Sequence, residues 1–271
     1  TLALGYNSFS GVVDSRIFAL PALVTIALGS NCFSGSLPSN VCNATELETL
    51  VLSDLSGGTC HQTYLWKGTA FEDTFTAFTV DNLMEGSVPE CIFNGMSKLK
   101  TIVLSGNRFL GQLPADLSPR ITFLDVSQNY LTGDLPAAVS RPNFEFFDGS
   151  HNRFNGTLSN FGGAYSFTTP NRTLRLGVNR LSGDIPHTLK NLDDVNILTG
   201  NVFGCSTGTQ NNLPVNDPND VEYMCGSNAY DESLSIFAGF IFIFIIMLLC
   251  TYCWSLRYTA EIREWTKPFY Q

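Results

Sequence analysis

The amino-acid sequence predicts a solenoid of stacked repeats in the α/β class, followed by a single membrane-spanning helix. Asparagine recurs in the same apolar context along most of the 271-residue chain. Charged residues make up only 14% of the sequence, which agrees with short, largely buried repeats. Near the C-terminus, Ile236–Leu256 carries no charge, and about 20 such residues suffice to cross a bilayer.

The repeat is clearest in two neighbouring copies, Ile102–Pro114 and Leu124–Pro136. In both, an apolar residue lies three positions before an Asn and another lies two positions after it; Gly, Leu and Pro then follow at fixed distances. The alternating apolar residues predict a short strand with one buried face. We expect the Asn to point inward and satisfy backbone groups, while the Gly allows an unusual backbone conformation. One unit cannot bury its apolar edge alone, so the units must stack.

The same pattern returns from the N-terminus to about residue 204. One step is longer, 82 − 31 = 51 residues, and we interpret it as two periods. Inside it, Leu47–Gly57 is a degenerate copy with Asp54 near the Asn position, and residues 57–75 form an irregular insertion. We therefore expect about nine repeats, with one strand per repeat in a continuous parallel sheet. The ladder residues are Asn7, Asn31, Asn82, Asn107, Asn129, Asn152, Asn179 and Asn201.

This pattern resembles the plant-type extracellular leucine-rich repeat, Leu-x-x-Leu-x-Leu-x-x-Asn-x-Leu-Ser/Thr-Gly-x-Ile/Leu-Pro, over roughly residues 1–204. The resemblance implies a curved right-handed solenoid, with a parallel sheet on the concave side and 3₁₀ or irregular segments on the convex side. Thr79 and Gly149 stand where apolar strand residues are expected, and Ser159 replaces a Pro. Because the chain begins within a repeat at Thr1, we expect a cap or further protein before it.

The repeats are followed by a polar, Pro-containing segment between Cys205 and Cys225. A solenoid needs a cover for its last repeat, so we predict a Cys205–Cys225 disulfide that closes a cap over residues 205–233. The segment resembles the closing part of leucine-rich-repeat proteins from algae such as diatoms. Four further cysteines precede the apolar stretch and allow three pairings, which the sequence leaves open: Cys32, Cys42, Cys60 and Cys91.

The apolar stretch is assigned to a transmembrane helix over residues 234–256. The alternative is a buried core helix, but no neighbouring sequence could cover it on all sides. Acidic residues precede the stretch, and Arg257, Arg263 and Lys267 follow it, so the repeats should lie outside or in a lumen and the tail 257–271 in the cytoplasm. Cys250 and Cys253 are interpreted as ordinary membrane-end residues rather than palmitoylation sites.

Three sequons support an external location of the repeats, although chance occurrence in an Asn-rich chain is the alternative. The predicted N-glycosylation sites are Asn43, Asn155 and Asn171.

The sequence gives no indication of catalysis, a cofactor or a metal site. His61, His151 and His187 are scattered through the repeats, and no Ser/His/Asp set or phosphate-binding loop is apparent. The tail has no room for a kinase domain, and the net charge of −9 disfavours nucleic-acid binding.

The residue directly after each ladder Asn should point outward and is a candidate for binding. This position holds Arg108, Tyr130, Arg153 and Arg180 in successive repeats, which predicts a basic strip with one aromatic residue on the concave surface. The alternative is a solubility feature without a ligand.

Two functions remain open at this stage. The first is a cell-surface, receptor-like recognition protein that binds a co-receptor, a peptide or a glycan through its repeats. The second is a structural or accessory single-pass subunit of a larger membrane assembly. A third possibility, an enzyme inhibitor built on the repeat, is disfavoured by the transmembrane helix.

Overall fold

The computed structural model describes residues 1–271 apart from 54–61, 65–77, 81–82, 163–171, 205–212 and 267–271. The chain forms two compact units, Thr1–Cys225 and Gly226–Gln271. The first unit contains the repeats and the segment that follows them, and the second is a single helix.

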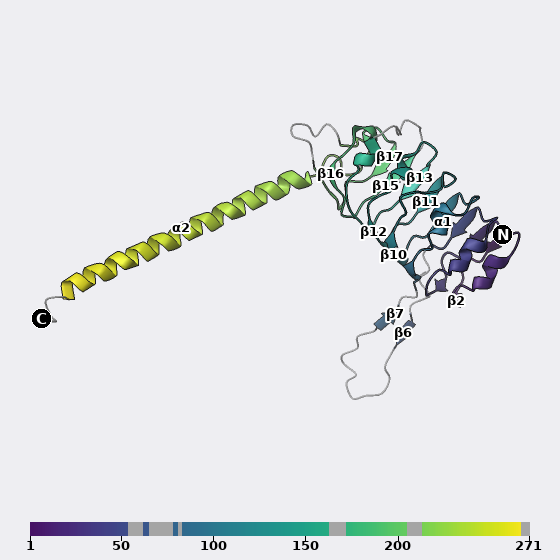
Figure 1. The fold of residues 1–271 in the computed structure, drawn as a ribbon, viewed down its shortest axis with the longest axis horizontal. Helices are drawn as coiled ribbons and strands as arrows, with labels where there is room; N and C mark the ends of the chain where they lie inside the picture. The colour runs from purple at the N-terminus through teal and green to yellow at the C-terminus, as the bar shows by residue number, and fades with distance from the viewer. Residues whose placement is uncertain (54–61, 65–77, 81–82, 163–171, 205–212, 267–271) are drawn as a thin grey trace, which may run out of the picture. The chain divides into compact units, whose positions relative to one another are not determined.

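The repeats build an eight-stranded parallel sheet, the sheet that the sequence predicts for the concave side (Figure 1). The first strand has two residues, and each of the other seven has three, with its central side chain buried in the solenoid core. In sheet order the strands are β1 (Leu2–Ala3), β3 (Thr25–Ala27), β5 (Thr49–Val51), β9 (Thr101–Val103), β11 (Phe123–Asp125), β13 (Phe146–Asp148), β15 (Thr173–Arg175) and β17 (Asp194–Asn196).

Most repeats contribute a second strand just after the ladder Asn, which the sequence analysis did not predict. Four of these strands form a further parallel sheet: β8 (Glu85–Ser87), β10 (Arg108–Gln112), β12 (Tyr130–Gly133) and β14 (Arg153–Phe154). Two pairs extend the pattern to the ends of the solenoid: β2 (Ser10–Gly11) with β4 (Cys32–Phe33), and β16 (Ser182–Asp184) with β18 (Val202–Gly204).

Short helical turns close the repeats across the core from the first sheet. Pro38, Pro136 and Pro186 directly precede three of these turns in an extended conformation, which is the backbone shape that Pro favours. The turns are η1 (Ser15–Ala19), η2 (Ser39–Asn43), α1 (Cys91–Asn94), η3 (Ala137–Ser140), η4 (Ser159–Gly162) and η5 (His187–Leu189). Phe18 and Val41 are fully buried and fix their turns to the core.

Gly149 departs from the apolar pattern for a packing reason. A Cβ atom at this position would lie 3.1 Å from the Phe147 ring and 3.2 Å from the Phe154 ring. The two buried Phe side chains therefore fill the space that a Leu or Val occupies in neighbouring repeats.

The prediction of a sheet strand directly before Asn82 is wrong. The apolar residues Phe78 and Val80 belong to β7 (Phe78–Val80), which pairs antiparallel with β6 (Gln62–Tyr64). In the eight-stranded sheet, β5 pairs directly with β9. The long step therefore contains one repeat, interrupted between β5 and β8, and not two complete repeats. Asn82 itself lies outside the described residues.

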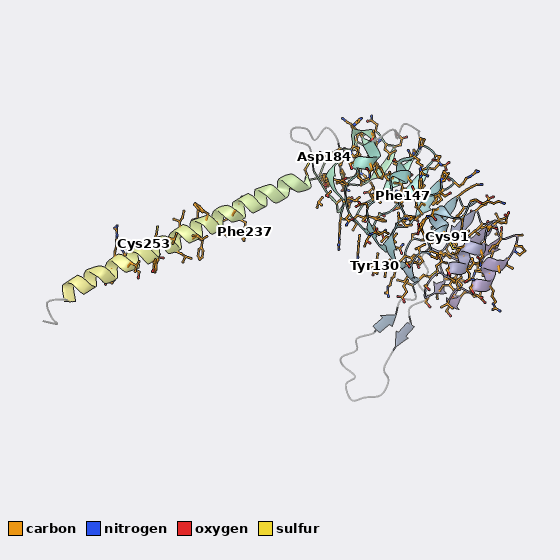
Figure 2. The ribbon with its side chains drawn as sticks, viewed as in Figure 1. Cys91, Tyr130, Phe147, Asp184, Phe237 and Cys253 are labelled. Carbon is orange, nitrogen blue, oxygen red and sulfur yellow. A yellow bond between two sulfur atoms is a disulfide. The ribbon has the colours of Figure 1, made fainter. Side chains whose placement is uncertain are left out.

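The second unit is the helix α2 (Gly226–Thr266). It begins before and ends after the predicted span 234–256. Within it, Ile236–Tyr258 is long and apolar enough to cross a membrane, and none of this stretch is buried against protein. Phe237 and Cys253 lie near its two ends (Figure 2). At about 1.5 Å per residue, this stretch matches the roughly 30 Å thickness of a bilayer core.

Candidate interaction surface

A ladder of buried asparagines joins the repeats. The side-chain amide of Asn129 donates to the carbonyl oxygen of Val126 in its own repeat (3.1 Å) and to that of Leu104 in the preceding repeat (3.0 Å). Its Oδ1 accepts the N–H of Phe109 at 3.0 Å. The same three kinds of contact recur at Asn31, Asn107, Asn152, Asn179 and Asn201. Asn7, in the first repeat, is exposed and donates to Leu4 and Gly5.

The ladder requires a left-handed backbone at the residue before most of these asparagines. Glycine supplies this conformation before Asn107 and Asn201. Elsewhere a residue with a side chain adopts it: Tyr6, Ser30, Gln128, His151 and Val178 have φ values between 53° and 59°. His151 is thus placed by a backbone requirement of the ladder.

The predicted strip of Arg108, Tyr130, Arg153 and Arg180 does not lie in the eight-stranded sheet. Arg108, Tyr130 and Arg153 are the first residues of β10, β12 and β14, in the second sheet, and Arg180 lies just before β16. The physical reason is the turn at each ladder Asn, which carries the chain out of the first sheet. The alternation of apolar and polar residues indicates on which side of the chain these side chains lie. It does not indicate to which of the two sheets they belong.

The second sheet separates the members of this strip. Tyr130 pairs in register with Leu110, and Arg153 pairs with Thr132, so each successive strip residue is displaced along the sheet. The Arg153 guanidinium nevertheless reaches diagonally over the Tyr130 ring, 4.6 Å from its centroid. Arg108 stands beside the acidic residue Glu85. The surface is therefore less basic than the sequence suggested.

The outward face of the eight-stranded sheet carries a different feature. One row of side chains, in register across the strands, runs Thr25, Thr49, Thr101, Phe123, Phe146, Thr173. The adjacent row runs Ala27, Val51, Val103, Asp125, Asp148, Arg175. Small side chains thus give way to aromatic and charged ones at β11. We name Phe123, Asp125, Phe146, Asp148 and Arg175 the Phe–Asp patch.

The two aromatic rings of this patch stack on each other. The centroids of Phe123 and Phe146 are 4.2 Å apart, and the ring planes differ by 5°. Both rings are half-buried, so part of the pair remains open to solvent. This pair was not predicted from the sequence, although one signal was present: each Phe directly precedes the buried central residue of its strand.

Both carboxylates of the Phe–Asp patch are held by the turn that follows them. Asp125 Oδ1 accepts from the backbone N–H of Ser127 (3.0 Å) and from its hydroxyl (2.7 Å). Asp148 Oδ1 is bound in the same way by Ser150, at 2.9 Å and 2.6 Å. Burial raises the pKa of Asp148, the hydrogen bonds from Ser150 oppose this shift, and the neighbouring charge of Asp125 adds to it.

The guanidinium of Arg175 completes the patch. It lies 5.9 Å from the centroid of the Phe146 ring and forms an ion pair with Asp194 at 3.0 Å. Asp194 also accepts a hydrogen bond from the hydroxyl of Thr173. The chain therefore already places one cation of its own against this aromatic pair.

A polar segment that includes Val215–Tyr223 covers the last repeat. Its side chains accept the backbone N–H groups that the Asn of a following repeat would otherwise bind. Asp217 Oδ2 accepts the N–H groups of Ile197 (2.7 Å) and Leu198 (3.1 Å). The Tyr223 hydroxyl accepts the N–H of Phe203 at 2.7 Å, as Asn201 Oδ1 does for Leu181. Burial raises the pKa of Tyr223. A phenol thus stands where the ladder would require another amide.

A disulfide joins Cys42 in η2 to Cys91 in α1, with Cα atoms 5.8 Å apart. It excludes two of the three pairings that the sequence left open. Cys32 and Cys225 are also disulfide-bonded, while Cys60 and Cys205 lie outside the described residues. Cys250 and Cys253 on α2 are free and exposed.

The sequon residues Asn43 and Asn155 are exposed, and Asn171 lies outside the described residues. His187 is the first residue of η5, and His61 lies outside the described residues. Among the residues that the structure places, no group of three or more His, Cys, Asp or Glu side chains could hold a metal ion.

Comparison with known proteins places these features in context. The family model described as Leucine Rich Repeat matches residues 98–119. Receptor-like protein 32 of Arabidopsis thaliana is 31% identical over 109 residues, which cover 37% of this chain and 12% of that protein. Receptor-like protein 41 of the same plant is 30% identical over 150 residues, covering 53% and 17%. The chain thus spans less than a fifth of the length of these relatives.

Solved structures agree on the fold. The Arabidopsis receptor kinase HAESA, in complex with the peptide hormone IDA and the co-receptor SERK1, matches with a TM-score of 0.58 and 23% sequence identity. The match covers 75% of this chain and 30% of that one. The chain therefore has the leucine-rich-repeat fold, and part of its length is similar in sequence to receptor-like proteins of Arabidopsis thaliana.

Proposed function

We propose that this protein is a receptor-like recognition protein that binds another protein or a peptide through its repeats. The observation that carries the proposal is the outward face of the eight-stranded sheet, where a stacked aromatic pair lies beside fixed charges. Aromatic and charged anchors of this kind dominate protein interfaces. The HAESA structure, which contains a peptide hormone and a co-receptor, supports peptide and protein partners.

We further propose that α2 anchors the repeats to a membrane, with the repeats outside and the C-terminus in the cytoplasm. Support comes from the unburied apolar stretch Ile236–Tyr258 and from Arg257 and Arg263 beyond most of it. In this orientation the exposed Asn43 and Asn155 face a compartment in which N-glycans are attached. The disulfide-bonded cysteines of the repeats agree with the same, oxidising compartment.

The recognition function is tested by chemical cross-linking of the full-length chain in native membranes, followed by mass spectrometry. The proposal expects a partner whose cross-links map to residues of the eight-stranded sheet and its flanking turns, such as Lys100 or Glu145. Cross-links confined to α2 would instead identify a structural subunit held by its helix.

Membrane orientation is tested on the same material. Treatment with an N-glycosidase should reduce the apparent mass of the wild type, and replacing Asn43 and Asn155 with Gln should reduce that mass change. Protease added to sealed vesicles from the cytoplasmic side should remove only the C-terminal tail. Digestion of the repeats from that side would reverse the proposed orientation.

A further inference from the structure

We infer that the Phe–Asp patch binds a cationic side chain, Arg or Lys, presented by a peptide segment of the partner. This inference rests on the proposed recognition function and adds to it the chemistry of the group that is recognised. It concerns the eight-stranded sheet and not the Arg and Tyr residues of the second sheet.

The stacked pair Phe123 and Phe146 leaves one ring face open. Phe146 faces Phe123 on one side and the region of Thr173 and Arg175 on the other. Phe123 has Thr101 as its other register neighbour, and a Thr side chain is too short to cover a whole aromatic ring. The ring face of Phe123 is therefore open toward β9, and the face of an aromatic ring attracts cations.

The two carboxylates of the patch are held in fixed orientations. In both Asp125 and Asp148, Oδ1 is occupied by the following Ser, which fixes the orientation of the carboxylate. Oδ2 of each receives no hydrogen bond from the part of the chain that the structure describes. Two fixed carboxylates in register on neighbouring strands repel each other, and a cation between them would relieve that repulsion.

The charge balance of the patch favours an incoming cation. Asp125, Asp148 and Asp194 lie on three of the four strands β11, β13, β15 and β17, and the one cation in the same rows is Arg175. Arg175 is already paired with Asp194. The nearby Lys100 is paired with Glu48 at 2.9 Å and so does not supply the missing charge.

The contact that Arg175 makes with Phe146 indicates what fits on the other side of the pair. A guanidinium against Phe123, reaching Asp125, would repeat the arrangement of Arg175 between Phe146 and Asp194. Beyond Phe123, the short side chains of Thr101, Val103, Thr49 and Val51 form a low surface. An extended peptide could lie across this surface while its cationic residue contacts the Phe–Asp patch.

The test uses the full-length protein in lipid nanodiscs and a display library of random nine-residue peptides as the probe. Arg and Lys should be enriched in peptides selected by the wild type relative to the input library. Asp125→Asn combined with Asp148→Asn keeps both Oδ1 acceptors, so the turns remain bonded, but removes both charges. This double variant should bind the selected peptides about tenfold more weakly, which corresponds to about 1.4 kcal/mol.

Two further variants test the aromatic contact and control for the change in net charge. Phe123→Leu combined with Phe146→Leu should also reduce binding, because the apolar volume stays similar while the ring faces are lost. Asp116→Asn combined with Asp184→Asn makes the same change in net charge at exposed positions outside the patch, and it should bind like the wild type. Thermal unfolding of each variant checks that the repeats remain folded.

Selection of peptides without Arg or Lys enrichment would overturn the inference, as would selection of no peptide at all. Equal binding by the wild type and the Asp125/Asp148 double variant would also overturn it. Any of these results is compatible with cross-links to the repeats, in which case the recognition function stands with a different ligand chemistry. Cross-links confined to α2 would remove the recognition function itself.

Discussion

Val178 adopts a backbone conformation that a β-branched residue normally avoids. Its φ is 57°, and it lies directly before the ladder residue Asn179, where the turn imposes a left-handed conformation. Asn tolerates this region far better than Val does. Because the Val178 side chain is 40% exposed, little packing is lost on substitution.

Val178→Asn is therefore expected to increase the free energy of unfolding by about 1 kcal/mol. Chemical denaturation of the wild type and the variant measures this difference. Val202→Asn is a matched control, because Val202 is also exposed but lies in the strand β18, where a β-branched residue is favoured. A loss of stability in Val178→Asn would indicate that the methyl groups of Val178 contribute more than the relief of strain.

Asp148 shows how the Phe–Asp patch reduces stability near neutral pH. Its pKa is raised in the folded protein, mainly by burial, relative to an ordinary value of about 3.9. The folded state therefore holds the proton more tightly than the unfolded state, and ionisation of Asp148 destabilises the fold above its raised pKa. This cost disappears as the pH falls through the raised pKa and below the ordinary value.

Asp148→Asn should consequently be more stable than the wild type near pH 7, and the advantage should vanish near about pH 3.5. Urea denaturation across this range measures the effect. Asp184→Asn, at an exposed position, should show no such pH-dependent difference. An advantage of Asp148→Asn that persists unchanged at low pH would point to a packing effect instead of a charge effect.

At the scale of elements, the polar segment after the last repeat depends on one hydroxyl group. Tyr223→Phe leaves the N–H of Phe203 without its acceptor while preserving the ring. We expect a loss of about 1–3 kcal/mol in the free energy of unfolding, the usual cost of an unpaired buried donor. Tyr130→Phe, at a 40% exposed ring, serves as the control and should be nearly neutral. Equal stability of the two variants would show that water replaces the hydroxyl.

The sequence predicted those elements that repeat and missed those that depend on pairing. The spacing around Asn129 was sufficient to predict the repeat, its short strand and the solenoid. The step from Asn129 to Tyr130 did not reveal a second sheet, because alternation gives the direction of a side chain but not its sheet. Phe123 and Phe146 become neighbours only through the register of β11 and β13.

Two further features lay beyond sequence reasoning. The alternating residues of β7 fit a repeat strand and a hairpin strand equally well, so the antiparallel pairing with β6 could not be foreseen. An Arg such as Arg172 is normally expected at the surface, but Arg172 is buried. Its guanidinium donates hydrogen bonds to the backbone oxygens of Phe144 and Arg141 at 2.7 Å each. Buried carbonyl groups that need a donor are visible only in three dimensions.

At the scale of the whole molecule, the sequences on the two sides of the interruption fit together as one repeat. Removing residues 54–80 would join Ser53 to Asp81 and create the sequence Leu-Ser-Asp-Asn-Leu-Met. This matches Leu-Ser-Gly-Asn-Arg-Phe at 104–109, with Met84 at the position of the buried Phe109. The shortened chain would then contain an uninterrupted repeat from β5 to β8.

The deletion of residues 54–80 should therefore leave a folded solenoid. Because long surface insertions have only a weak effect on stability, the melting temperature should change by only a few degrees, followed by circular dichroism. A deletion of the same length that begins at residue 101 removes β9 and β11 and should abolish cooperative unfolding. Failure of the first deletion to fold would show that the insertion contributes to the core.

The contacts of the polar segment also determine how the protein would respond to mechanical tension. Val215, Asp217 and Tyr223 contact Lys190, Ile197 and Phe203 in the same order along both segments. Without a disulfide at Cys225, a pull on α2 would reach Tyr223 first and break these contacts one at a time. The disulfide-bonded Cys225 lies between Tyr223 and α2, so the load meets a covalent bond first. The polar segment would therefore stay bound to the last repeat under tension while the disulfide at Cys225 is intact. It would separate from that repeat once the disulfide is reduced.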